Sequence, residues 1–220
     1  MSVWTSPNAR AFKDRHEAGV ALAGLLQGYA RRNDVVVLAL PRGGVPVAHE
    51  VAAALHLPLD VFSVRKLGVP GHPELAMGAI ASGGVQVFND EVLALYRPSA
   101  DTLEAVARVE MRELQRREQL YREGRPLVLV EGRTVILVDD GLATGSTMRA
   151  AVQAARQLHA QQVVVAVPVG APDTCQAMHR VADDVVCALM PDHFTAVGAW
   201  YLDFSETSDD EVRRLLTLTR

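Results

Sequence analysis

Cysteine is scarce in this sequence, which contains only Cys175 and Cys187. Two cysteines this far apart are too few for a zinc knuckle. Cys187 lies in an apolar, strand-like run, so we expect reduced thiols and a cytoplasmic protein. The seven histidines form no HExxH motif or similar ligand set. The sequence therefore has no pattern typical of a zinc site.

Long apolar runs and an excess of positive charge are also missing. The longest apolar runs, at 35–40 and 163–169, are far too short to span a bilayer, and the N-terminal residues lack the hydrophobic region of a signal peptide. The net charge is −4, so neither a membrane nor a nucleic acid is an expected partner. With 49% hydrophobic and 22% charged residues, the 220-residue chain is expected to form a single domain over 1–220.

The most informative stretch is 135–147, which reads VILVDDGLATGST. Its four apolar residues predict a buried strand, and two adjacent carboxylates, Asp139 and Asp140, follow where that strand must end. The glycine- and hydroxyl-rich turn that comes next leads into an amphipathic helix. Such a turn presents unpaired backbone N–H groups and the positive end of the helix dipole, which predicts a phosphate site.

The acidic pair would repel that phosphate, so it must serve another part of the ligand. Adjacent carboxylates accept hydrogen bonds from a cis-diol, or they hold a divalent metal through oxygen. A phosphate on one side and a diol on the other predict a ribose 5-phosphate. A P-loop is excluded, because Gly141 and Gly145 enclose three residues rather than four and Ser146 stands where Lys would be.

Apolar periodicity predicts an alternation of strands and helices along the chain. Strands are expected at 35–40, 59–64, 78–81, 85–88, 135–138, 163–169 and 185–189, and helices at 10–32, 45–55, 148–158 and 172–181. This alternation predicts an α/β fold with an open, mostly parallel sheet and helices on both faces. Ligands of such sheets bind at the carboxyl ends of the strands.

Two segments in the middle of the chain have a different character. Residues 65–77 are rich in glycine, proline and charge, which predicts a long mobile loop. Ser99 or Asp101 is expected to cap a charged helix that runs to about Glu123. The dense Arg/Glu pairs of this helix indicate a solvated face, with a contact in a homo-oligomer as the alternative.

In its order of aliphatic strand, acidic pair, small residues and Thr-Gly-x-Thr, the stretch 135–147 resembles the signature of the type I phosphoribosyltransferases. The resemblance implies a pentosyl-transferring enzyme of nucleoside metabolism. Such an enzyme transfers ribose 5-phosphate between PRPP, bound with Mg²⁺, and a nitrogenous base, and releases pyrophosphate. By this resemblance Asp139 and Asp140 hold the ribose hydroxyls. The residues that it assigns to the 5-phosphate are Ala143, Thr144, Gly145, Ser146 and Thr147.

A second motif, Leu40-Pro41-Arg42-Gly43-Gly44, follows the first predicted strand. Two glycines after an arginine let backbone amides close on an anion, while the guanidinium adds a charged fork. The resemblance assigns Arg42, Gly43 and Gly44 to pyrophosphate and implies a cis peptide bond between Pro41 and Arg42.

The charged pair Arg65-Lys66 opens the predicted loop at 65–77. An ordinary solvated pair is one interpretation. The other, implied by the resemblance, is that the loop closes over PRPP, excludes water and brings both cations to the leaving pyrophosphate. The predicted catalytic residues are thus Arg42, Lys66, Asp139 and Asp140.

The stretch that begins Pro191-Asp192-His193-Phe194 and ends Leu202-Asp203-Phe204 resembles the hood of hypoxanthine-guanine phosphoribosyltransferases. The resemblance implies a small hood subdomain at about 189–207, in which Phe194 stacks on the base and Asp203 holds Mg²⁺. A core position for Phe194 is the alternative. Ala143 stands where the 6-oxopurine enzymes have an aspartate, so a purine, a pyrimidine or another base stays open.

Two other functions were weighed against this enzyme. The first is a non-catalytic regulator on the same fold that senses PRPP or a nucleotide, against which the retained Arg42–Gly44 and Arg65-Lys66 speak. The second is a sugar-phosphate phosphatase or hydrolase. It would need a nucleophile, and neither the turn at Asp139–Gly141 nor any Ser/His pairing supplies one in familiar form.

Overall fold

The computed structural model describes residues 10–218, except for the side chains of Pro73 and Glu74. Its centre is a five-stranded parallel sheet in the order β2-β1-β6-β7-β8. The strands are β1 (Val35–Ala39), β2 (Leu59–Val61), β6 (Thr134–Val138), β7 (Gln162–Val169) and β8 (Asp184–Leu189). The prediction of an open parallel sheet is confirmed.

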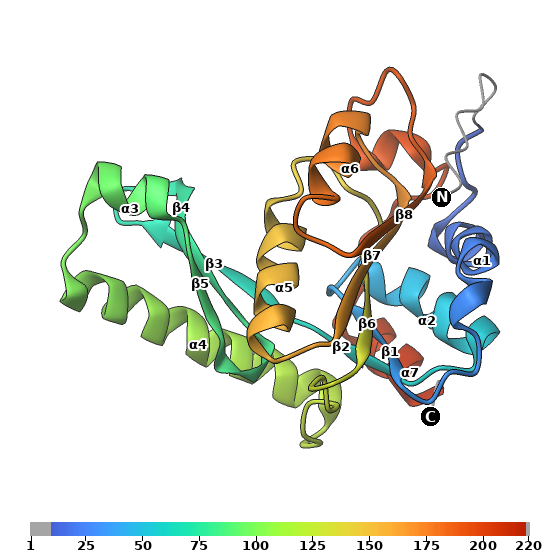
Figure 1. Ribbon diagram of the computed structural model, residues 1–220, viewed down its shortest axis with the longest axis horizontal. Coiled ribbons are helices and arrows are strands. Elements are labelled where there is room, and N and C mark those ends of the chain that lie inside the picture. Colours follow the sequence, from blue (N-terminus) through green and yellow to red (C-terminus); the bar gives the residue numbers. More distant parts are fainter. Residues whose placement is uncertain (1–9, 219–220) are drawn as a thin grey trace.

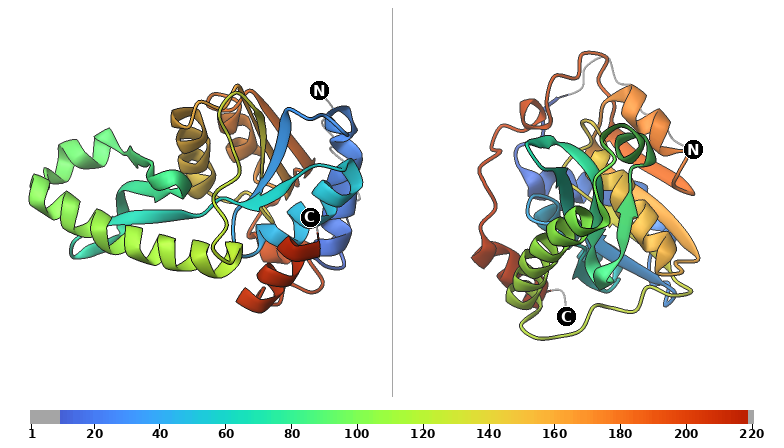
Figure 2. Two further views of the ribbon diagram at one scale, coloured as in Figure 1. Left: turned by 90° about the horizontal axis from the view of Figure 1, so that it is seen from below. Right: turned by 90° about the vertical axis from the view of Figure 1, so that its left-hand side faces the viewer.

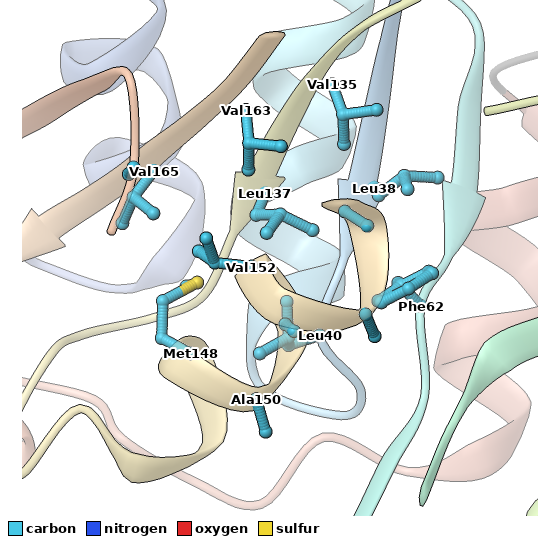
Figure 3. Close-up of a cluster of buried hydrophobic side chains, with 14 of the residues drawn as sticks. Leu38, Leu40, Phe62, Val135, Leu137, Met148, Ala150, Val152, Val163 and Val165 are labelled. Carbon is cyan, nitrogen blue, oxygen red and sulfur yellow. The ribbon is translucent and has the colours of Figure 1, made fainter. Parts of the chain in front are cut away.

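Helices cover both faces of this sheet (Figure 1), which explains why its central strands are apolar throughout. One face carries α1 (Arg15–Leu25), α2 (Gly44–Leu55) and α7 (Asp209–Leu218), and the other carries α5 (Ser146–Gln157) and α6 (Pro172–Met178). Alternate residues of a strand point to opposite faces. Leu38, Leu137 and Val163 accordingly pack toward α5, where Figure 3 shows them beside Met148 and Val152.

A second unit, which we call the arm, projects from the parallel sheet (Figures 1 and 2). It consists of the antiparallel strands β3 (Val64–Val69), β4 (His72–Ala81) and β5 (Gln86–Phe88) and the helices α3 (Asp90–Tyr96) and α4 (Ala100–Arg122). Ser99 caps α4 as predicted, its side chain accepting from the Thr102 amide. The short helix α3 was not foreseen.

The prediction of a long loop at 65–77 was wrong in its secondary structure. The segment forms most of β3 and β4, with a left-handed Gly71 (φ 82°) at the turn between them. Glycine and proline obscure the strand alternation in the sequence. Leu67 and Ile80 are nevertheless buried against Leu114 of α4, a contact that only the tertiary fold supplies.

The C-terminal segment, for which no helix was predicted, ends in α7, which packs against α2 and α4. Before it, a 3₁₀ turn at Val197–Trp200 follows a stretch without regular structure. Among the helices of residues 10–218, none has both the length and the apolar character needed to cross a bilayer.

Candidate active site

The carboxyl edge of the parallel sheet brings the two sequence motifs together. β1 and β6 are neighbours, with Ala39 opposite Val138. Just beyond them, the Leu40 amide donates to the Val138 carbonyl at 2.8 Å. The loop 41–44 and the acidic pair 139–140 therefore leave the sheet side by side, at the edge where ligands of such sheets bind.

Glycine is required at both positions where the loop 41–44 meets the acidic pair. A Cβ at Gly44 would lie 2.7 Å from the Val138 carbonyl oxygen, and a Cβ at Gly43 would overlap Oδ2 of Asp140. The Gly44 amide, predicted to bind pyrophosphate, already donates to the Leu40 carbonyl at 3.1 Å. The Gly43 amide is thus the better candidate donor for an anion.

The two carboxylates are partly buried and electrostatically coupled. Burial raises the pKa of Asp139 well above its usual range, and the negative charge of Asp140 adds to the rise. Burial also raises the pKa of Asp140, while the cation Arg15 opposes that rise. Oδ1 of Asp139 accepts the Asp140 amide at 2.9 Å, which ties the two residues into one unit.

Arg15 of α1 is a residue of this site that the sequence analysis missed. Its Nη2 and Nε lie 2.8 and 2.9 Å from Oδ2 of Asp140, and its Nη1 donates to the Ser205 carbonyl at 2.7 Å. The guanidinium carbon lies 4.0 Å from the ring centroid of Phe204. The Tyr201 hydroxyl, whose pKa burial raises, donates to the Asp140 carbonyl at 2.6 Å. No local sequence pattern marks Arg15, because its partner is 125 residues away.

The predicted phosphate loop has the shape expected of an anion site. Gly145 adopts a left-handed conformation (φ 72°) as the N-cap of α5, so the first amides of this helix have no intrahelical acceptor. The Thr144 and Ser146 hydroxyls lie 3.3 Å apart. Arg149, which the sequence analysis did not consider, donates to the Thr144 carbonyl at 2.6 Å. The exposed residues of the loop are Ala143, Thr144, Ser146 and Thr147.

Arg42 does not point into open space. The peptide bond between Pro41 and Arg42 is cis, as the resemblance implied. The guanidinium forms an ion pair with Glu206 and lies 3.7 Å from a carboxylate oxygen of Asp209. Asp209 also accepts the Tyr121 hydroxyl at 2.7 Å. The guanidinium that was predicted to bind pyrophosphate is thus paired with acidic side chains of the C-terminal segment.

Arg65 and Lys66 lie on β3 in the arm. Arg65 forms an ion pair with Glu110 of α4, with 2.6 Å between Nη2 and Oε2, and Lys66 is exposed. A shallow cavity of about 320 Å³ is lined by Val64, Arg65, Lys66, Gly68 and Glu110. The structure therefore pairs Arg65 with Glu110 rather than bringing it to the acidic pair.

Residues of the predicted hood pack in one cluster with Phe12 and with Ala18 of α1. Phe194 is half-buried and packs against a small cluster that includes Phe12, Val169 and Tyr201. Phe204 is 37% exposed and is the aromatic side chain stacked on Arg15. In this conformation Phe194 has the packing of a core residue, and Phe204 contacts Arg15, the partner of Asp140.

Asp203, the predicted Mg²⁺ ligand, is a single exposed carboxylate. Its Oδ1 accepts the Ser205 amide at 3.0 Å, and this hydrogen bond holds the pKa of Asp203 below its usual range. Within the described part of the chain, no three metal-ligating side chains form a group that would hold an ion by themselves.

Together, the fold and the site define an α/β protein whose parallel sheet brings a glycine- and hydroxyl-rich turn beside an acidic pair at its carboxyl edge. The chain belongs to the phosphoribosyl transferase domain family, whose model matches residues 10–205. The resemblance to the type I phosphoribosyltransferases is thereby confirmed.

Two relatives are similar to this chain over most of its length, and the name of the first agrees with the family assignment. The chain is 50% identical over 203 residues to "Putative phosphoribosyl transferase Rv0571c" of Mycobacterium tuberculosis; the match covers 92% of this chain and 46% of that protein. The chain thus spans about half the length of the curated relative it matches. Its structure superposes on that of TT1426 from Thermus thermophilus with a TM-score of 0.83 and 44% identity, covering 94% of this chain and 97% of the other.

Proposed function

We propose that this protein transfers ribose 5-phosphate from PRPP to a nitrogenous base and releases pyrophosphate. The observation that carries the proposal is the close packing of the loop 41–44 on Asp140, beside an exposed anion-type turn. This arrangement offers separate places for a diol, a 5-phosphate and a leaving group.

The 5-phosphate is proposed to bind at the turn 143–147. The first-turn amides of α5 and the positive end of its dipole favour an anion there. The Thr144, Ser146 and Thr147 hydroxyls supply further donors. Arg149 holds the turn through the Thr144 carbonyl, so it supports the turn without having to touch the phosphate.

Asp139 and Asp140 are proposed to hold the ribose hydroxyls. Positive charge grows on the ring as pyrophosphate leaves, and a nearby carboxylate stabilises that charge most strongly where water is excluded. Little acid–base chemistry is needed from the protein, because orientation and charge stabilisation carry such a transfer.

The leaving pyrophosphate is proposed to contact the Gly43 amide and the Arg42 guanidinium, which would exchange Glu206 for phosphate oxygens. Arg65 and Lys66 remain proposed ligands of the same group, because β3 follows directly after the carboxyl end of β2. For Arg65 this requires the loss of its pair with Glu110.

Mg²⁺ is the expected companion of PRPP. It is often held by one or two carboxylates together with substrate phosphates and water, so a protein cage is not required. The acidic pair and the exposed Asp203 fit that role through oxygen ligands. When bound, the ion would neutralise charge on the pyrophosphate.

The acceptor is proposed to be a nucleobase-like heterocycle, bound near the hood at 189–207 by Phe194. The half-buried Phe194 would have to expose its ring to stack on that base. Ala143 offers no charged partner, so the identity of the base is left to experiment. The location in the cytoplasm and the homo-oligomer contact on α4 stay predictions.

The test is pyrophosphate release from Mg²⁺-PRPP with a panel of nucleobases, together with calorimetry of PRPP alone. Release with at least one base supports the enzyme. Binding of PRPP without release from any base would instead favour the alternative, a regulator that senses PRPP or a nucleotide. Absence of both binding and release would contradict the proposal.

A further inference from the structure

We propose that Arg15 is a positioning residue that orients the Asp140 carboxylate toward the ribose diol, and so makes the site prefer a ribose phosphate to a 2-deoxyribose phosphate. This inference rests on the function proposed above, in which Asp140 holds a ribose hydroxyl. It assigns a role to a residue of α1, far in sequence from either motif of the site.

All three guanidinium nitrogens of Arg15 make polar contacts, and one aromatic ring packs against the group. Two of its nitrogens contact one oxygen, Oδ2 of Asp140, at 2.8 and 2.9 Å, and the third donates to the Ser205 carbonyl at 2.7 Å. Its flat face lies against the Phe204 ring, 4.0 Å from the centroid. Only 11% of the side chain is exposed. A planar fork fixed in this way has little freedom to follow its partner, so it sets the partner's orientation.

Oδ2 of Asp140 is also closed off from the other side. A Cβ at Gly43 would overlap this oxygen and would lie 3.4 Å from Nε of Arg15. Oδ2 therefore sits in a slot between the guanidinium and the backbone of the loop 41–44. Both contacts of Arg15 are made to Oδ2, which leaves Oδ1 of Asp140 as the oxygen that can turn to a ligand.

The backbone of Asp140 is fixed as well. Its amide donates to Oδ1 of Asp139, and its carbonyl accepts the Tyr201 hydroxyl at 2.6 Å. The remaining freedom is rotation of the carboxylate, and Arg15 removes it. The ionisable groups that face Asp140 are Asp139 after β6, Arg15 of α1 and Tyr201 of the C-terminal segment.

Charge supports the same conclusion. Arg15 is a cation in direct contact with the Asp140 carboxylate, with 2.8 Å between Nη2 and Oδ2. A carboxylate oxygen that is free of this contact can accept a hydrogen bond from a sugar hydroxyl. Arg15 thus acts on the ligand through Asp140, without contacting the ligand itself.

The experiment measures binding of ribose 5-phosphate and of 2-deoxyribose 5-phosphate by calorimetry. The dissociation constant of 2-deoxyribose 5-phosphate divided by that of ribose 5-phosphate is the ratio that reports recognition of the 2-hydroxyl. Arg15→Met keeps the aliphatic stem against Phe204 but removes the charge, and we expect it to lower this ratio about tenfold. Arg15→Lys restores one donor and the charge, so it should recover part of the ratio. Binding of inorganic phosphate should be unchanged in both variants.

Arg10→Ala is the matched control, because Arg10 lies in the same N-terminal region and forms an exposed ion pair with Glu17. It should leave the ratio at the wild-type value. Thermal melting of each variant in the absence of ligand separates a loss of fold from a loss of recognition.

A double-mutant cycle with Asp140→Asn tests the route of the effect. If Arg15 acts through Asp140, Arg15→Met should change the ratio little once Asp140 is an asparagine. A full effect in that background would overturn the proposal, since it would mean that Arg15 contacts the sugar directly. So would a folded Arg15→Met variant with the wild-type ratio. If the wild-type protein binds neither sugar phosphate nor PRPP, the proposed function itself fails, which is a different outcome.

Discussion

Arg42 and Glu206 form an ion pair between the loop after β1 and a segment 164 residues further along the chain. The loop of Arg42 was predicted to receive pyrophosphate, and Glu206 lies beyond the predicted Mg²⁺ ligand Asp203. A carboxylate bound to this guanidinium competes with any phosphate that approaches it. The C-terminal segment and the proposed leaving group would therefore compete for one cation.

Glu206→Gln should tighten binding of pyrophosphate. Removal of this charge frees Nη2 of Arg42, while Asp209 stays 3.7 Å from Nη1, and because the pair is exposed we expect a gain of about threefold in affinity. Calorimetry with Mg²⁺-pyrophosphate measures it. Asp210→Asn is the control, since Asp210 is exposed and its partner is Arg213 rather than Arg42. Unchanged or weaker binding by the Glu206 variant would contradict the competition.

Asp140→Asn should lower PRPP-dependent turnover by about tenfold or more, which corresponds to about 1.4 kcal/mol of barrier. The physical reason is the loss of a negative charge beside the ring as positive charge develops there. Asp101→Asn, on the exposed first turn of α4, should leave turnover unchanged. Wild-type turnover in the Asp140 variant would remove the acidic pair from the mechanism.

Gly145→Ala should cost stability and weaken binding of phosphate together. Its φ of 72° is unfavourable for alanine by about 1–2 kcal/mol. The new Cβ would also lie 2.8 Å from Cγ2 of Thr174, which displaces the turn. Gly124→Ala is the control, because Gly124 has φ 82° with no atom within 4 Å of the new Cβ. Urea unfolding should report a loss in both variants, and phosphate titration a loss in the Gly145 variant alone.

Asp139→Asn should stabilise the protein at neutral and alkaline pH. A carboxyl whose pKa is raised by folding binds its proton more tightly in the folded state. The free energy of unfolding therefore falls as pH rises from the ordinary Asp value of 3.8 through the raised value. At about pH 8 the variant should have a larger free energy of unfolding than the wild type. The difference between the two free energies should vanish toward about pH 4. Denaturant unfolding across this range measures it, and a pH-independent difference would rule out the burial of this charge as the cause.

Arg122→Ala should destabilise the fold by about 3–5 kcal/mol, because it leaves a buried carboxylate without its partner. Arg122 donates to both oxygens of Asp60, at 3.0 and 3.1 Å, and to the Val61 carbonyl at 2.7 Å. This network fastens the end of α4 to β2. Arg108→Ala, which breaks an exposed pair with Glu104, should change the unfolding free energy by less than about 1 kcal/mol. Equal effects in urea unfolding would show that burial does not matter here.

Much of the fold could be predicted because its signals are local. The central strands are apolar throughout, since both faces of the sheet are covered, and the turn at Gly145 carries its own hydroxyls. The arm could not be predicted in the same way. Its strand β3 is stabilised by contacts with α4, whose contacting residues lie at least forty positions further along the chain. Periodicity within a short stretch of sequence does not predict such a distant contact.

Some residues of the candidate site could likewise be predicted from local sequence, and others could not. One strand, β6, is followed directly by Asp139, Asp140 and the turn 143–147. Because these residues are neighbours along the chain, the sequence alone predicts that they lie close together. The approach of the loop 41–44 depends only on β1 and β6 being neighbours in the sheet. Arg15 and Glu206, by contrast, reach the site from α1, a helix packed on the sheet, and from a segment without regular structure, and neither carries a local motif.

By itself, the amino-acid order determined the class of sheet, the anion-type turn and the acidic pair, because hydrophobic periodicity and chain neighbours act over a few residues. Only the tertiary structure decided which charges meet: Arg15 with Asp140, Arg42 with Glu206 and Arg65 with Glu110. Ion pairs form between side chains that folding brings together, and their separation along the chain has no bearing on the distance between them.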